Sequence, residues 1–284
     1  MTDNEFIEIC SSKKNRMHCI VGPNTSGKTY LLKNAFENIP GKSLYIDEEG
    51  AVIPKDCRKV ATIVGNEYIY SDDSNRGQTN KKIEKEIANH NSMEIINCIK
   101  NYKNRIPTKY KSLGSSKILN ILNYLLSYNL NNIDFFLFDE PENSLDDENL
   151  KIIKGIFSVL NKNGKYIIMV THSPRLLELL DINIDDIYIR PGIFKEIKNV
   201  KRETILEKYK NHGLDISKFA NFNQLNKAKR LLFSDNVTMA NLYLDNLLKS
   251  FEFYKTLFYN GVIIVEGQTE LLMTKHMSDE LPIS

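Results

Sequence analysis

The sequence has no tryptophan, only four cysteines and no long apolar run. Its cysteines, Cys10, Cys19, Cys57 and Cys98, lie far apart, without a CxxC pair or histidines at zinc-site spacing, so we interpret them as reduced thiols. No run reaches the roughly 18 apolar residues of a membrane-spanning helix, and the N-terminus lacks the basic and apolar segments of a signal peptide. We therefore expect a cytoplasmic protein that does not span a membrane.

Excess charge of one sign is also missing. The chain has 38 basic and 36 acidic side chains, a formal net charge of +2, so its overall balance does not predict a polyanionic partner. Hydrophobic residues make up 42% and charged residues 26% of the 284 residues, which is typical of a globular protein with a sizeable core.

Short apolar runs alternate with segments of helical periodicity along the first two thirds of the chain. This alternation predicts an α/β sheet with helices on its faces. The strands are expected at residues 19–21, 43–46, 60–64, 133–138 and 165–170, with a terminal hairpin at 187–200, and the helices at 30–36, 118–126 and 146–160. We expect a domain at 1–200 with a helical insertion at 80–110, a helical region at 201–260, and a new unit at 261–284 that begins with a buried strand.

A phosphate-binding loop is predicted between the first strand and the first helix. Residues 22–29, GPNTSGKT, match GxxxxGK[ST] without a mismatch. In such a loop the backbone amides and the helix N-terminus surround the phosphates, Lys28 reaches the β- and γ-phosphates, and Thr29 binds magnesium. The alternative, a glycine-rich turn that merely starts a helix, would not need four fixed identities. The predicted ligands are ATP and Mg²⁺, bound by Gly22, Pro23, Asn24, Thr25, Ser26, Gly27, Lys28 and Thr29.

Two acidic residues follow the apolar strand that ends at residue 138. Asp139 stands where a second magnesium ligand would leave the sheet, and Glu140 is suited to orient and deprotonate the attacking water. Acidic residues often open a helix, so this pair alone is weak evidence. After an intact phosphate loop it predicts an ATPase, with Lys28 and Glu140 among its catalytic residues.

Residues 139–146, DEPENSLD, resemble the Walker B motif and D-loop of the ABC ATPase superfamily, and residues 169–174, MVTHSP, resemble its switch-histidine loop. The resemblance implies that Asp146 contributes to the nucleotide site. It also implies that His172 contacts the γ-phosphate and the attacking water. The alternative for a lone histidine at a strand end is a polar loop residue.

The ABC signature is expected shortly before Walker B. Residues 111–117, KSLGSSK, resemble Leu-Ser-Gly-Gly-Gln in part: Ser112 and Gly114 keep the Ser-x-Gly spacing, but the leading leucine and the glutamine are missing. A helix cap is the alternative. In the family, the signature of one subunit completes the site of the other, which implies a head-to-tail homodimer with ATP between the subunits. Gln78, in the polar loop at 72–82, is one candidate for the Q-loop.

The last residues carry a second resemblance. Residues 262–270, VIIVEGQTE, resemble the opening strand and acidic loop of a TOPRIM domain, and with the switch loop they resemble the overcoming-lysogenisation-defect (OLD) family of ATPase–nucleases. The resemblance implies acid/base or metal chemistry at Glu266, with Glu270 as a further acidic group. An ordinary buried strand and helix cap is the alternative. No Asp-x-Asp pair follows Glu270, so we expect the nuclease to be incomplete in this chain or supplied by a TOPRIM partner.

The sequence is compatible with three functional classes of ABC protein. We expect an ATPase that regulates a DNA-directed effector, a nuclease, with antiviral defence suggested by family association and DNA as a further partner. The alternatives are the ATPase subunit of a transporter and a DNA-repair ATPase without a nuclease. Only 82 residues separate Thr29 from Ser112, with no sustained heptads, which excludes a long coiled-coil arm.

Overall fold

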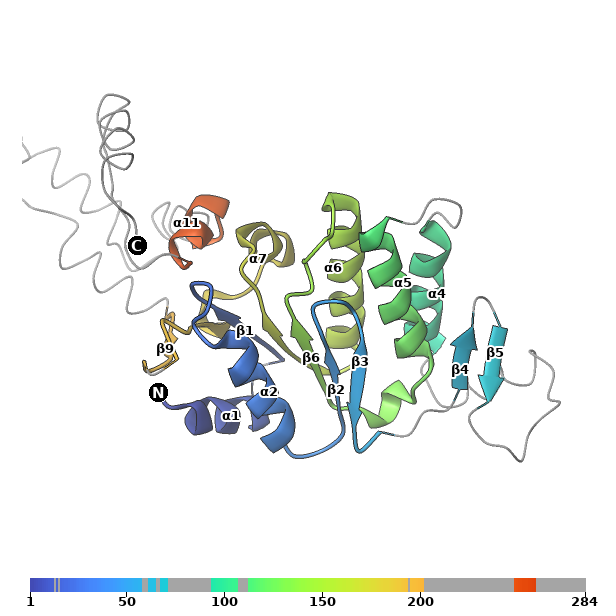
Figure 1. The fold of residues 1–284 in the computed structure, drawn as a ribbon, viewed down its shortest axis with the longest axis horizontal. Coiled ribbons are helices and arrows are strands. Elements are labelled where there is room, and N and C mark those ends of the chain that lie inside the picture. Colours follow the sequence, from blue (N-terminus) through green and yellow to red (C-terminus); the bar gives the residue numbers. More distant parts are fainter. Residues whose placement is uncertain are drawn as a thin grey trace, which may run out of the picture.

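A seven-stranded sheet forms the centre of the computed structural model (Figure 1), which describes residues 1–12, 14, 16–57, 61–64, 67–70, 93–106, 112–193, 195–201 and 248–258. Five neighbouring strands run parallel, and one antiparallel strand lies at each edge. The mixed sheet confirms the predicted α/β class. In order across the sheet, the strands are β3 (Val52–Lys55), β2 (Ser43–Ile46), β6 (Phe135–Asp139), β7 (Tyr166–Val170), β1 (Met17–Val21), β8 (Ile187–Ile189) and β9 (Lys198–Asn199).

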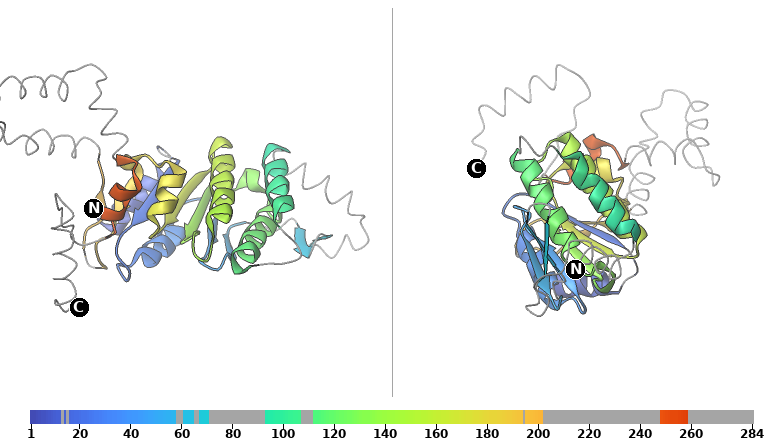
Figure 2. Two further views of the ribbon diagram at one scale, coloured as in Figure 1. Left: turned by 90° about the horizontal axis from the view of Figure 1, so that it is seen from above. Right: turned by 90° about the vertical axis from the view of Figure 1, so that its right-hand side faces the viewer.

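Helices cover both faces of the sheet. Figure 2 shows the blue N-terminal helices on one side and the yellow-green helices on the other. The first face carries α1 (Asp3–Ser11) and α2 (Lys28–Asn38), and the second carries α4 (Met93–Arg105), α5 (Leu113–Leu126), α6 (Asp147–Lys162) and α7 (Pro174–Leu180). Helix α11 (Phe251–Thr256) packs against α7.

Strand β6 shows why its sequence is apolar without interruption. Phe135 and Leu137 pack into the core beneath α1 and α2, whereas Phe136 and Phe138 pack into the core beneath α4 to α7. Side chains alternate between the faces of a strand, so a strand covered on both sides must be apolar at every position. The apolar run ends at the carboxyl end of β6, where Asp139 is the last residue of the strand.

The structure differs from the predicted elements near the N-terminus and after β3. The predicted strand at 60–64 forms as β4 (Ala61–Val64), but it pairs with β5 (Glu67–Tyr70) in a separate two-stranded sheet. We did not predict α1, although Thr2 and Glu5 form a capping box at its start. Nor did we predict β3, whose Pro54 is tolerated because the strand lies at an edge.

The predicted hairpin at 187–200 is present in shorter form as β8 and β9. All four cysteines are free, as expected. Within the described ranges, no helix is both long and apolar enough to cross a membrane.

Several predictions fall outside the described residues. These are the polar loop at 72–82 with Gln78, most of the helical region at 201–260, and the segment at 261–284 with Glu266 and Glu270. The proposed domain boundaries therefore stay predictions.

Candidate active site

The phosphate loop lies between the end of β1 and the start of α2, and its two glycines are required by its shape. Gly22 has a φ of 148° and Gly27, the N-cap of α2, a φ of 85°, which are conformations that side chains disfavour. A Cβ atom on Gly22 would also lie 2.2 Å from the carbonyl oxygen of Arg190. The backbone therefore dictates two of the identities that define the motif.

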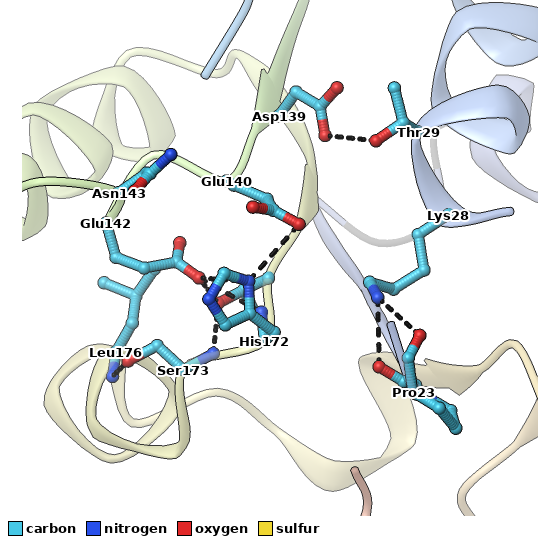
Figure 3. A network of polar contacts seen from close by, with 12 residues as sticks. Pro23, Lys28, Thr29, Asp139, Glu140, Glu142, Asn143, His172, Ser173 and Leu176 are labelled. Carbon is cyan, nitrogen blue, oxygen red and sulfur yellow. Dashed lines mark hydrogen bonds and ion pairs between the residues drawn. The ribbon is translucent and has the colours of Figure 1, made fainter. Parts of the chain in front are cut away.

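Lys28 is folded back over its own loop (Figure 3). Its side chain is buried, and Nζ donates hydrogen bonds to the carbonyl oxygens of Gly22, at 3.0 Å, and Pro23, at 2.9 Å. Burial lowers the pKa of Lys28, and three nearby carboxylates, that of Glu140 most, oppose this shift. An ammonium group has three donors, so these two bonds do not exhaust its capacity for phosphate oxygens.

Ser26 supplies a direct test of whether the loop fits a phosphate group. Its hydroxyl is buried and has no hydrogen-bond partner among the described residues. Buried hydroxyls are normally satisfied, so an unsatisfied one inside a phosphate-type loop fits a ligand that accepts hydrogen bonds. The loop thus suits a phosphate in shape and in donor chemistry.

Thr29 and Asp139, the two predicted magnesium ligands, are brought together from positions 110 residues apart. The Thr29 hydroxyl donates to Asp139 Oδ1 at 3.1 Å, and the Tyr45 hydroxyl donates to Oδ2 at 2.6 Å. Burial raises the pKa of Asp139, and the hydrogen bonds from Tyr45 and Thr29 oppose that shift. A hydroxyl and a carboxylate oxygen are the hard ligands that Mg²⁺ prefers, so the pair fits this ion.

Glu140 and His172, each predicted to act on the attacking water, contact each other. His172 Nδ1 lies 3.2 Å from Glu140 Oε1, and the two side chains face each other beside Lys28 (Figure 3). The hydrogen bond from His172 lowers the pKa of Glu140 against the effect of burial, and the same bond raises the pKa of His172. Glu140 is thereby kept as a carboxylate, the form that accepts a proton from water.

Glu142 belongs to the site, although the sequence analysis assigned it no role. Its buried Oε1 accepts hydrogen bonds from the Thr171 hydroxyl, at 2.6 Å, and from the His172 backbone amide, at 3.0 Å. Burial raises the pKa of Glu142, and these hydrogen bonds oppose the shift. Glu142 therefore fixes the start of the loop that carries the His172 ring, and the only hint in the sequence was a glutamate within a tight turn.

Ser112 and Asp146 each cap a helix. Ser112 Oγ accepts a hydrogen bond from the Ser115 amide at the start of α5, and Asp146 Oδ1 accepts one from the Asn149 amide at the start of α6. For Ser112, this is the alternative considered beside the signature. The nucleotide contacts of Ser112, Gly114 and Asp146 stay predictions.

The segment around the predicted signature contacts the loop that follows Glu140 in the same chain. A Cβ atom on Gly114 would lie 2.5 Å from the Ser144 carbonyl oxygen. Buried Lys117, one turn further along α5, donates to the carbonyl oxygens of Glu140, at 3.1 Å, and Asn143, at 3.2 Å. The start of α5 is therefore tied to the backbone of the proposed base, a link that the sequence did not reveal.

Comparison with known proteins gives relatives of one kind. No protein-family model matches the chain. A putative ABC transporter ATP-binding protein of Pyrococcus furiosus is 26% identical over 242 residues, which cover 76% of this chain and 85% of that protein. An energy-coupling factor transporter ATP-binding protein of Mycoplasma mobile is 28% identical over 225 residues, covering 66% and 70%. A solved ABC transporter component of Clostridium perfringens is 16% identical over 69% of this chain and 84% of that one, with a TM-score of 0.40, which is too low to bear on function.

Two observations point to the same family. One is the geometry that places Lys28, Thr29, Asp139, Glu140 and His172 at one end of the sheet. The other is the sequence similarity, which extends over two thirds to three quarters of the chain. Together they support the assignment of the chain to the ABC-type ATPases.

Proposed function

We propose that this site hydrolyses ATP with Mg²⁺ and that Glu140 is the general base. The observation that carries the proposal is the pairing of Glu140 with His172 beside the phosphate loop, together with the pairing of Thr29 with Asp139. The first pair provides an ionised base and the second provides oxygen ligands for the metal. Bound Mg²⁺ would offset the negative charge that develops on the phosphates.

Lys28 and Ser26 bind the phosphates in this proposal. The Lys28 ammonium exchanges the carbonyl oxygens of Gly22 and Pro23 for phosphate oxygens, and the buried Ser26 hydroxyl gains the acceptor that it lacks. Lys28 thereby exchanges neutral acceptors for charged ones, and Ser26 gains a hydrogen bond to a charged acceptor.

Thr29 and Asp139 would hold Mg²⁺ through their hydroxyl and carboxylate oxygens, and Tyr45 keeps Asp139 oriented through its 2.6 Å hydrogen bond. Glu140 then orients the attacking water and takes its proton onto a carboxylate oxygen. His172 holds the Glu140 side chain, and Glu142 holds the backbone of His172.

The active form in this proposal is a head-to-tail homodimer. Ser112, Gly114 and the N-terminus of α5 would face the phosphates bound by the partner subunit, because a helix N-terminus attracts negative charge. The side chain of Leu113, between them, is 76% exposed, which suits a surface that a second subunit covers. Contact of a partner subunit with α5 would then affect the backbone of Glu140 through the hydrogen bond from Lys117.

Two candidates exist for the process that ATP hydrolysis drives. Regulation of a DNA-directed nuclease is supported by the likeness of residues 262–270 to a TOPRIM opening, with Glu266 and Glu270 as its acidic groups. A role as the ATP-binding subunit of a transporter is supported by the similarity to transporter ATP-binding proteins. The nuclease candidate predicts DNA-dependent ATPase activity, and the transporter candidate does not.

The cleavage test uses the purified chain with supercoiled and linear DNA, Mg²⁺ or Mn²⁺, with and without ATP. We expect ATPase activity without DNA cleavage, because Glu266 and Glu270 alone make at most a partial metal site. Nicking that disappears in Glu266→Ala would contradict this expectation, and cleavage restored by a separate TOPRIM protein would favour the nuclease candidate.

Nucleotide binding is tested with Lys28→Ala. We expect the variant to lose Mg-ATP binding in isothermal titration calorimetry, because the phosphates lose their ammonium partner. Lys162→Ala, which removes an exposed lysine at the end of α6, is the matched control and should bind as the parent does. Equal affinity in the Lys28 variant and the parent would refute the assignment of the phosphate loop.

A further inference from the structure

We propose that Ile193, in the loop after β8, and Tyr30, in the first turn of α2, bind the base of the nucleotide between them. We expect the base that they contact to be a purine, which has a flat ring system. This inference rests on the proposed function, because it concerns the same nucleotide.

The loop after β8 lies directly against the phosphate loop at both of its glycines. A Cβ atom on Gly22 would meet the Arg190 carbonyl oxygen, and one on Gly27 would lie 3.2 Å from Ile193 Cγ1. Ile193 is therefore next to the N-cap of α2, at the end of the loop where Lys28 follows.

The order of the strands indicates in which direction the nucleoside must point. Asp139 ends β6, Glu140 follows it, and His172 lies after β7; both strands lie on the same side of β1. The terminal phosphate must face these residues, because the attacking water is bound there. The other end of the nucleotide then points away from them, and on the opposite side of β1 lies β8, whose loop carries Ile193.

Ile193 is exposed but held in place. Its side chain is 53% exposed, whereas the buried guanidinium of Arg190 donates to the Ile193 carbonyl oxygen at 2.8 Å and pairs with Asp3 of α1. A loop whose backbone is already held in place loses little conformational freedom when a ligand covers it.

Tyr30 supplies an aromatic ring at the start of α2. Tyr30 follows Gly27, the N-cap of α2, by three residues, and residues at this spacing lie on the same face of a helix. Tyr30 is 65% exposed. In the part of the chain that the structure describes, only five large apolar residues are exposed; one of them, Ile193, lies next to Gly27, and another, Tyr30, lies in the first turn of the helix that Gly27 caps. Aromatic rings bind nucleic-acid bases by stacking, and an aliphatic side chain can cover the other face.

The test separates the base from the phosphates by comparing Mg-ATP with inorganic tripolyphosphate. The variants are Ile193→Ser and Tyr30→Ala, with Ile53→Ser as control, because Ile53 is similarly exposed but lies on the edge strand β3. We expect ATP affinity, measured by calorimetry, to fall roughly tenfold or more in each test variant. Tripolyphosphate affinity should stay at the parent value, and the control should change neither.

Unchanged ATP affinity in both test variants would overturn the inference. An equal loss for ATP and tripolyphosphate would also overturn it, because it would show a disturbed phosphate loop and not a lost base contact. A parent protein that binds neither ATP nor tripolyphosphate would refute the proposed function itself. Failure of the inference and failure of the proposed function are therefore distinguishable.

Discussion

The buried carboxylate of Glu142 gives a sharp test of how the site is held together. In Glu142→Ala, the hydroxyl of Thr171 and the amide of His172 lose their acceptor. Each unsatisfied buried donor costs about 1–3 kcal/mol. Thr171 is fully buried, so its unsatisfied hydroxyl carries the full cost. His172 is partly exposed, so water can accept a hydrogen bond there and reduce the cost. We expect a decrease of about 2–4 kcal/mol in the free energy of unfolding.

For a chain of this size, such a loss lowers the melting temperature by roughly 3–7 °C. Glu142→Gln is the matched control, because its amide oxygen can accept the same two hydrogen bonds. We expect this variant to melt closer to the parent than Glu142→Ala does. We also expect Glu142→Ala to lose more in single-turnover hydrolysis than in ATP affinity, since Glu142 holds the His172 loop and not the phosphate loop.

Thermal unfolding and single-turnover assays on both variants decide the matter. Equal destabilisation by alanine and glutamine would show that the charge of Glu142 matters and its acceptor geometry does not. An alanine variant as stable as the parent would refute the role of Glu142 as an anchor.

Three other changes test neighbouring parts of the site. Gly22→Ala should cost about 2 kcal/mol or more in urea unfolding because its Cβ meets Arg190, whereas Gly41→Ala, also at positive φ but with more space, should cost less; equal costs would count against the clash. Lys117→Met leaves two carbonyl oxygens without their donor and should cost about 1–3 kcal/mol in the same assay; an unchanged midpoint would contradict the link. The raised pKa of His172 means that its stabilising effect is complete below the unfolded-state pKa and is lost as pH rises through the folded-state pKa. Glu140→Gln should lower that pKa in NMR titration, and an unchanged value would exclude the pair as its cause.

The phosphate loop could be predicted because backbone geometry restricts its sequence. Gly22 and Gly27 occupy conformations that only glycine adopts easily, so a short motif reports a specific shape. Strand β6 could be predicted for a similar reason, since burial on both faces requires an unbroken apolar run that ends where Asp139 begins.

The supporting residues could not be predicted because their roles depend on contacts between distant elements. Glu142 contacts a residue 29 positions away, and Lys117 contacts a carbonyl oxygen 23 positions away. Glu142 lies in a turn, which has no repeating period, and the position of Lys117 on the buried face of α5 does not indicate which carbonyl oxygens it contacts. The pairing of β4 with β5 could not be predicted either, because the pattern of residues in one strand does not indicate which strand it pairs with.

We propose Glu140 as the base of an ATPase that works as a closed dimer. The most direct measurement is ATP turnover, together with the mass in solution by light scattering, for Glu140→Gln with Mg-ATP. We predict that the variant keeps ATP affinity, loses roughly 10²–10⁴-fold in hydrolysis, and accumulates as a dimer with ATP bound. Hydrolysis at the parent rate would contradict the account.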